Sequence, residues 1–139
     1  MPNPFRRVTD QFSVAPQIAL SDLATAASLG FGLVISNRPD GEEPAQPSAA
    51  VMEAAAKAAG LKFAHIPVVG GPTAAQADDM AALIEGSETP VLAFCRSGTR
   101  SITTWSLGQL RAGNQGRDAL VDQAAGAGYD LSAALPRAM

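Results

Sequence analysis

The residues best suited to chemistry lie in one short run, Cys95-Arg96-Ser97-Gly98-Thr99-Arg100-Ser101. Cys95 is the only cysteine of the 139-residue chain, and it directly follows an apolar segment at 91–94. The thiolate is the reactive form of cysteine, and neighbouring arginines favour that anion. Gly98 lets the backbone curl so that several N–H groups converge on one point, and a helix beginning after the run would add its dipole. The run therefore predicts an anion-binding loop with a nucleophile at its base.

Each residue of this loop has an expected role. Cys95 is the candidate nucleophile, and Arg100 is the candidate group that stabilises the bound anion. The backbone N–H groups of residues 96–101 would form the cup, and the other candidate anion-binding residues are Arg96, Ser97, Gly98, Thr99 and Ser101. A lone cysteine is more often a small buried hydrophobe. The polar run that follows the apolar segment favours a reactive role instead.

Alternating strand and helix patterns supply the elements that must position the loop. The predicted strands are 12–16, 31–36, 61–69 and 91–94, and the predicted helices are 21–28, 48–60, 73–85 and 101–111, with shorter helical pieces near 117–126 and 131–135. Such alternation predicts an α/β fold with a mainly parallel sheet flanked by helices, in a single domain over residues 1–139. Ligands of such sheets bind beyond the carboxyl ends of the strands, which is where Cys95 falls.

Composition excludes several classes of protein. Hydrophobic residues make up 47% of the chain and charged residues 17%, with a net charge of −3, so a compact globule is expected. There is no basic stripe with interleaved aromatics, no apolar run of about 20 residues and no secretory leader, so we expect no nucleic-acid partner, no membrane and a cytoplasmic location. A single cysteine fits a reducing compartment, and one cysteine with one histidine cannot build the usual zinc site, so neither metal nor other cofactor is expected.

Two residues after the predicted strand 31–36 are candidates for the rim of the site. Arg38 either lines the pocket and attracts an anionic substrate or simply pairs with a neighbouring acid; the sequence leaves both open. Asp40 is either a stand-in acid or a residue that orients a loop arginine, although a solvated acidic loop with Glu42 and Glu43 is the simpler interpretation. His65, among apolar neighbours, is interpreted as a hydrogen-bonded core histidine.

Four blocks of the sequence are familiar in combination: residues 94–101 with Trp105, residues 36–43 (SNRPDGEE), residues 65–68 (HIPV) and residues 127–132 (AGYDLS). Together they resemble the phosphatase-like domain of the beta-lactamase hydrolase-like protein family, over nearly the whole chain from about Phe12 to Leu135. The resemblance implies a fold like that of the dual-specificity phosphatases. In some bacteria this domain is fused to a persulfide dioxygenase and is described as a sulfurtransferase, which makes a persulfide dioxygenase a candidate partner.

The loop departs from the phosphatase pattern in its length. Cysteine phosphatases carry His-Cys, five residues and then Arg, whereas four residues separate Cys95 from Arg100, Phe94 replaces the histidine, and Ser101 falls where the phosphatase arginine would. This spacing resembles the rhodanese loop, in which the cysteine carries a persulfide. The stretch 68–72, where dual-specificity phosphatases usually have an aspartate general acid, contains no acid.

We therefore expect a cysteine-dependent sulfurtransferase that moves sulfane sulfur through a Cys95 persulfide. The donor would be a small anionic sulfur compound (thiosulfate, a polysulfide or a persulfide), and the acceptor a thiol, cyanide or sulfite. The enzymatic alternative is a cysteine-dependent phosphatase with a phosphocysteine intermediate. A third possibility is a non-catalytic sensor, in which Cys95 responds to oxidants or sulfide.

Overall fold

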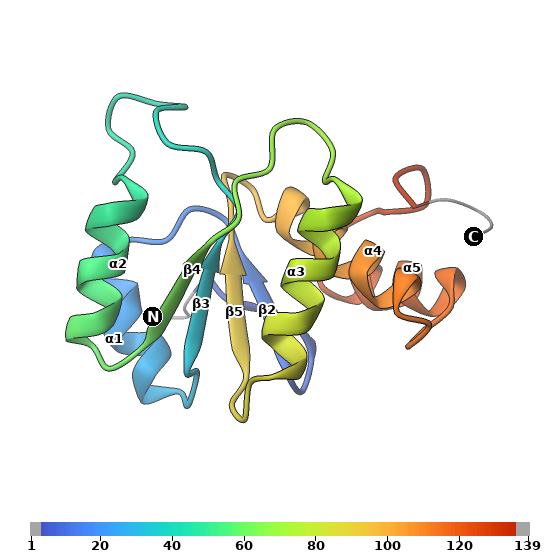
Figure 1. Ribbon diagram of the computed structural model, residues 1–139, viewed down its shortest axis with the longest axis horizontal. Coiled ribbons are helices and arrows are strands. Elements are labelled where there is room, and N and C mark those ends of the chain that lie inside the picture. Colours follow the sequence, from blue (N-terminus) through green and yellow to red (C-terminus); the bar gives the residue numbers. More distant parts are fainter. Residues whose placement is uncertain (1–3, 136–139) are drawn as a thin grey trace.

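A computed structural model describes residues 4–135 of the chain as an α/β fold, with five strands in one sheet of order β1-β2-β5-β3-β4 (Figure 1). The α/β fold class expected from the sequence is confirmed, and β2, β5, β3 and β4 run parallel to one another. The strands are β1 (Arg6–Thr9), β2 (Phe12–Ala15), β3 (Leu33–Ser36), β4 (Lys62–His65) and β5 (Val91–Phe94). The helices are α1 (Leu20–Ser28), α2 (Ala49–Ala58), α3 (Ala74–Glu85), α4 (Thr99–Arg111) and α5 (Arg117–Gly126).

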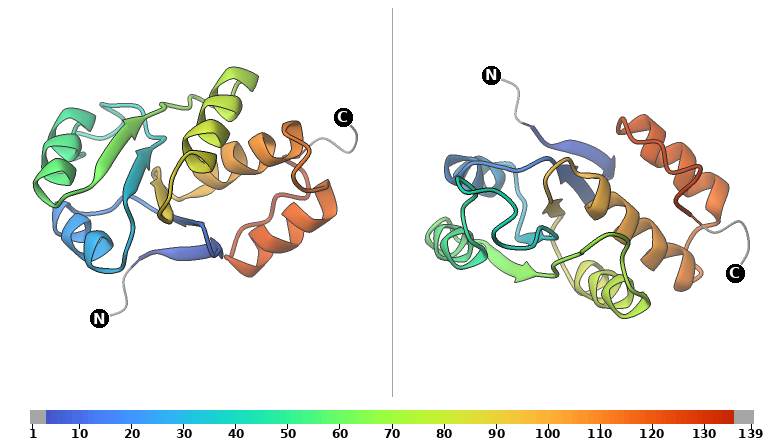
Figure 2. Two further views of the ribbon diagram at one scale, coloured as in Figure 1. Left: turned by 60° about the horizontal axis from the view of Figure 1, so that its bottom comes forward. Right: turned by 90° about the horizontal axis from the view of Figure 1, so that it is seen from above.

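Helices cover both faces of the sheet and bury two separate apolar cores (Figures 1 and 2). Helices α1 and α2 lie on one face, where Leu23 and Met52 pack against Val34 and Phe94. Helices α3, α4 and α5 lie on the other face, where the ring of Trp105 stacks on that of Phe12 with centroids 5.0 Å apart. Within residues 4–135 no helix is long and apolar enough to cross a membrane.

The three central strands end level with one another, and this places the loop after β5. Phe94 pairs with Ala15 on one side and with Ser36 on the other. The pairing continues one residue further, because Asn37 N–H donates to the Phe94 carbonyl at 2.8 Å. Cys95 therefore begins the loop at the centre of the sheet's carboxyl edge, where parallel sheets hold their ligands.

Strand β1 was not predicted, and it makes one edge of the sheet antiparallel. It pairs with β2 through a tight connection at residues 10–11. Its sequence, Arg-Arg-Val-Thr, has no apolar run because it lies at the edge and its side chains are half-buried or exposed. Periodicity cannot identify such a strand.

Two predicted boundaries and one predicted helical piece were wrong. The strand predicted over 61–69 ends at His65, because its pairing partner β3 is only four residues long. Helix α4 begins at Thr99 rather than at residue 101, because the preceding glycine already caps it. Residues 131–135 form a turn rather than a helix, closed by hydrogen bonds to the carbonyl of Leu131.

Candidate functional site

The segment after β5 folds into a tight loop around the sulfur of Cys95. Gly98 has a φ of 97°, a left-handed conformation that favours glycine, and it is the N-cap residue of α4. Its N–H donates a hydrogen bond to the Cys95 Sγ atom at 3.0 Å. Its carbonyl accepts the first backbone hydrogen bond of α4, from Ile102 N–H at 3.0 Å. The sulfur thus lies at the N-terminus of a thirteen-residue helix.

The loop leaves several backbone donors unpaired. Among residues 4–135, no hydrogen-bond partner exists for the N–H groups of Arg96, Ser97, Arg100 and Ser101. Cys95 itself has no exposed surface. Burial alone is typical of a structural cysteine. A sulfur that already accepts one N–H, beside unpaired N–H groups at a helix N-terminus, is instead placed to carry negative charge.

Arg100 spans the distance between this loop and two other loops. Its Nη1 and Nη2 atoms donate to the two carboxylate oxygens of Glu42, both at 2.8 Å, and Nη1 also donates to the Val68 carbonyl at 3.0 Å. Hydrogen bonding to Glu42 is the main cause that raises the pKa of Arg100, and the negative charge of Cys95 raises it further. Hydrogen bonding to Arg100 in turn lowers the pKa of Glu42 to about 2.

The two candidate rim residues have different positions. The Arg38 side chain is only 3% exposed and donates to Glu42, Glu43 and Gln17, so it pairs with neighbouring acids rather than opening onto a pocket. Asp40 is exposed and accepts a hydrogen bond from the N–H of Ala49 at 2.8 Å, at the start of α2. It does not contact the loop arginine; Glu42 has that role.

The side chains of Arg96, Ser97 and Thr99 bind partners other than the sulfur. The Arg96 side chain is 68% exposed and pairs with Glu43 at 3.1 Å. The Ser97 hydroxyl donates to the Thr99 hydroxyl at 3.1 Å and accepts from the Thr99 N–H, so these two residues brace the turn. The hydroxyl of Ser101 is buried without a hydrogen-bond partner among the described residues. The candidate anion-binding site therefore consists of the backbone N–H groups of the loop, the Cys95 sulfur and the Arg100 guanidinium.

Sequence reasoning missed Tyr129 as part of this site. Its hydroxyl donates to the Ser97 carbonyl at 2.9 Å and lies where a Cβ atom on Gly98 would be. The Arg6 guanidinium lies over its ring, 5.2 Å from the centroid. Burial raises the pKa of Tyr129, and the charge of Cys95 contributes to that rise. Glu42 was considered only as part of a solvated acidic loop, and no local pattern links it to an arginine 58 positions away.

His65 has the role expected of a hydrogen-bonded histidine. Its Nε2 atom lies 2.9 Å from the Arg38 carbonyl, 27 positions away in the chain. Within residues 4–135 the ring makes no hydrogen bond to the Cys95 loop. It therefore supports the segment that carries Glu42.

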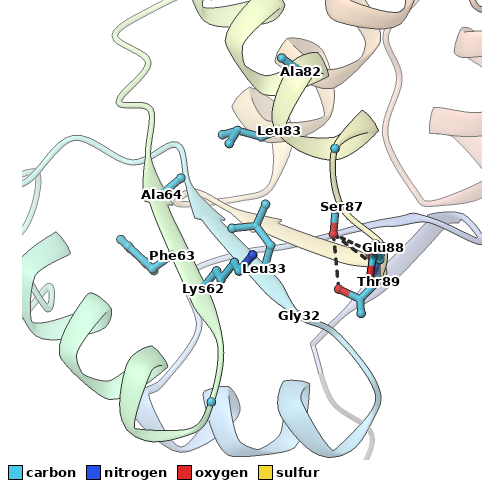
Figure 3. Close-up of a pocket in the computed structure, with 12 residues that line it drawn as sticks. Gly32, Leu33, Lys62, Phe63, Ala64, Ala82, Leu83, Ser87, Glu88 and Thr89 are labelled. Carbon is cyan, nitrogen blue, oxygen red and sulfur yellow. Dashed lines mark hydrogen bonds between the residues drawn. The ribbon is translucent and has the colours of Figure 1, made fainter.

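A separate groove lies at the end of the sheet where the parallel strands begin. It is bounded by β3, β4 and the end of α3, with Lys62, Leu83 and Thr89 among its lining residues (Figure 3). These residues lie at the amino ends of the strands, far from the end where Cys95 begins its loop. Across residues 4–135, no group of three or more His, Cys, Asp or Glu side chains is arranged to hold a metal ion.

Comparison with known sequences gives consistent results. The family model for the phosphatase-like domain of beta-lactamase hydrolase-like protein matches residues 4–112. The chain is 38% identical over 130 residues to the beta-lactamase hydrolase-like protein of Agrobacterium fabrum, covering 92% of this chain and 30% of that protein. The chain thus spans about a third of the length of its curated relatives.

Solved structures share the fold. A candidate phosphatase from Neisseria meningitidis is 32% identical, with a TM-score of 0.81 over 91% of this chain and 90% of the other. The active form of Tk-PTP has a TM-score of 0.76 at 19% identity, covering 95% of this chain and 90% of that one. The second likeness concerns the fold alone. It confirms the predicted relation to the dual-specificity and tyrosine phosphatase architecture.

Proposed function

The chain belongs to the family of phosphatase-like domains of beta-lactamase hydrolase-like proteins, and from this premise we propose that it is a group-transfer enzyme with Cys95 as the nucleophile. The cargo we propose is one sulfane sulfur atom, held on Cys95 as a persulfide. The unpaired N–H groups of the loop and the Arg100 guanidinium would stabilise the anion, first as a thiolate and then as the persulfide.

The observation that carries this proposal is the engagement of Arg100. A transferring phosphoryl group needs a guanidinium that grips its oxygens in a bidentate manner. Both terminal nitrogens of Arg100 are bound to Glu42, and the sixth residue after Cys95, where phosphatases have their arginine, is the buried Ser101. A cup of this kind is better suited to a single sulfur atom than to a phosphoryl group.

The segment 68–72 also favours sulfur transfer over phosphoryl transfer. Arg100 binds the carbonyl of Val68, at the start of the segment 68–72, which contains no acid to protonate an alkoxide leaving group. General acid catalysis typically contributes about 10²–10⁴-fold to such a reaction. Sulfur transfer needs less help, because its leaving group departs as a stable thiolate.

The proposed reaction has two balanced steps. The Cys95 thiolate attacks the outer sulfur of a persulfide R–S–SH, the new S–S bond forms as the old one breaks, and R–S⁻ leaves. Cys95 then carries –S–SH. In the second step a thiolate, sulfite or cyanide acceptor attacks that outer sulfur, and Cys95 leaves as the thiolate. No external oxidant or reductant is consumed.

Phosphate monoester hydrolysis is the second candidate, and the comparisons favour it. The family is described as phosphatase-like, and the Neisseria meningitidis protein that is 32% identical is described as a candidate phosphatase. In this alternative Cys95 would attack phosphorus and form a phosphocysteine, and Arg100 would have to leave Glu42 to bind the phosphoryl oxygens.

Intact mass spectrometry separates these functions. The protein is exposed to glutathione persulfide or thiosulfate and then to cyanide, with Cys95→Ser as the control. We expect the wild-type chain to gain the mass of one sulfur atom and to lose it to cyanide as thiocyanate, and the serine variant to gain nothing. Turnover of phosphotyrosine peptides with no sulfur bound from any donor would establish the phosphatase instead. Sulfur that is bound but never released to an acceptor would indicate a sensor.

A further inference from the structure

A cluster of acids and arginines joins the Cys95 loop to the segment after β3. We call it the acid–arginine cluster, and it consists of Arg38, Glu42, Glu43, Arg96 and Arg100. Glu42 accepts hydrogen bonds from Arg38 Nε at 2.9 Å and from both terminal nitrogens of Arg100. Glu43 accepts from Arg38 Nη2 at 3.0 Å and pairs with Arg96 at 3.1 Å. The guanidinium beside Cys95 therefore already holds an anion, and that anion belongs to the protein.

Glu42 is held in place by bonds from its own segment. Arg38, whose side chain is 3% exposed, uses its remaining terminal nitrogen to donate to Gln17 Oε1 at 2.9 Å. The Glu42 N–H donates to Gln46 Oε1 at 3.2 Å, and Gln46 Nε2 donates to the Pro39 carbonyl at 2.9 Å. The Glu42 side chain itself is 30% exposed. It is a fixed part of the site rather than a loose surface acid.

The net charge of the acid–arginine cluster disfavours the binding of a dianion. Three guanidinium groups face two carboxylates, and an ionised Cys95 makes the local sum neutral. A doubly charged substrate would add uncompensated charge and would also compete with Glu42 for Arg100. Charges a few ångströms apart at a protein surface are only partly screened by solvent, so each extra charge on the substrate affects its binding.

We propose that Glu42 is a specificity-determining residue that disfavours dianions in the Cys95 loop. Phosphate monoesters and thiosulfate are disfavoured, and the site is left to donors with a single negative charge at the reacting end, the low-molecular-weight persulfides. The identity of the donor rests on the proposed sulfur transfer. The discrimination between anions does not, because it can be measured as binding.

The ionisation of Glu42 persists at the pH of ordinary assays. Hydrogen bonds from Arg100, followed by those from Arg38, lower its pKa to about 2. A change of pH around neutrality therefore cannot neutralise the carboxylate. Substitution is the direct test.

The first experiment measures anion binding without turnover. Inorganic phosphate and sulfate are titrated as protectants of Cys95 against iodoacetamide, in the wild type, in Glu42→Gln and in Glu53→Gln. Glu53 is an α2 residue that pairs only loosely with Lys57, at 4.0 Å, so its variant makes the same change of charge and side chain elsewhere. We expect Glu42→Gln to bind both dianions at least about tenfold more tightly than the wild type and Glu53→Gln to match the wild type. Equal binding by all three proteins would overturn the proposal.

The second experiment compares donors. The rate of sulfur loading on Cys95 is measured with thiosulfate and with glutathione persulfide. We expect the wild type to prefer the persulfide and Glu42→Gln to gain selectively on thiosulfate. An unchanged ratio of the two rates would contradict the role of Glu42. If no donor loads sulfur on any of these proteins, the proposed sulfur transfer is refuted. The protection experiment still tests whether Glu42 disfavours dianions.

Thermal unfolding checks that each variant is folded. If Glu42→Gln does not fold, the proposal is tested with the wild-type protein alone. Protection by sulfate is then compared with protection by the monoanion thiocyanate. Sulfate binding as tight as thiocyanate binding would refute the proposal.

Discussion

Gly98 concentrates several requirements of the site in one residue. Its φ of 97° lets its N–H reach the Cys95 sulfur while its carbonyl begins α4. A side chain there would also meet the Tyr129 hydroxyl. The residue is thus needed both for its backbone freedom and for its lack of a Cβ atom.

Gly98→Ala is therefore expected to destabilise the protein by about 1–2 kcal/mol or more, because alanine resists the left-handed conformation and displaces Tyr129. Urea unfolding measures the loss. Gly113→Ala is the control, since Gly113 also has a positive φ (74°) but open space around its Cβ position. If both variants lose the same stability, the contact with Tyr129 contributes nothing.

Arg100→Lys tests whether the arginine acts through its geometry or its charge. A lysine retains the charge but cannot bind both Glu42 oxygens and the Val68 carbonyl from one plane. Losing one charge-assisted hydrogen bond corresponds to a rate loss on the order of tenfold. We expect sulfur loading to fall by at least that factor in Arg100→Lys and by more in Arg100→Ala. Full activity of the lysine variant would show that a point charge is enough.

For single residues, the sequence predicted those features of the site that depend on neighbours in the chain. The spacing of Cys95, Gly98 and Arg100 on one turn follows from a short run between an apolar strand and a helix. The partner of Arg100 could not be predicted, because Glu42 lies 58 positions away and its own neighbourhood resembles an ordinary solvated turn. The same reason hid Tyr129, which is 32 positions from the carbonyl that it binds.

Among the elements, α5 and the segment after it act on a loop that they do not adjoin in sequence. They lie beyond residue 112, where the match to the family model ends. Leu120 and Ala124 of α5 pack in the same core as Trp105 of α4. Tyr129, in the segment after α5, donates a hydrogen bond to the Ser97 carbonyl. The loop after β5 is thus supported from one side by α4 and from the other by the C-terminal segment.

Tyr129→Phe isolates this support. The ring remains to pack on Gly98 and under Arg6, while the Ser97 carbonyl loses its donor. We expect a loss of about 1 kcal/mol in the free energy of unfolding and a change in the alkylation rate of Cys95 by iodoacetamide at neutral pH. Chemical unfolding and the alkylation time course measure the two effects. A variant with lower stability and an unchanged alkylation rate would show that the Tyr129 hydroxyl stabilises the fold without affecting Cys95.

For the whole molecule, the architecture was the most predictable level. Buried parallel strands are continuous apolar runs, and the helices α2 and α3 begin directly after Ser48 and Thr73, whose side chains accept hydrogen bonds from the first helical turn. The sequence did not predict the polar edge strand β1 or the short turn at 131–135, because neither periodicity nor capping residues identify them. Tertiary pairing decides these segments.

The acid–arginine cluster should also appear in the acid unfolding of the molecule. The pKa of Glu42 falls from 4.5 to about 2 on folding, so its contribution to stability is complete above about pH 4.5 and disappears as the pH approaches 2. Glu42→Gln should therefore be less stable than the wild type at pH 6, and this difference should shrink toward pH 2.5. Urea midpoints at several pH values measure it. A difference that stays constant with pH would mean that the ion pair contributes nothing to folding.

The contact between Tyr129 and Gly98 also has an evolutionary consequence. The two positions share one small volume, so they should vary together. A lineage that acquires a larger residue at 98 must first shorten the side chain at 129, and a lineage that keeps the tyrosine is restricted to glycine. Substitutions in the C-terminal segment would thereby control which changes the Cys95 loop can accept.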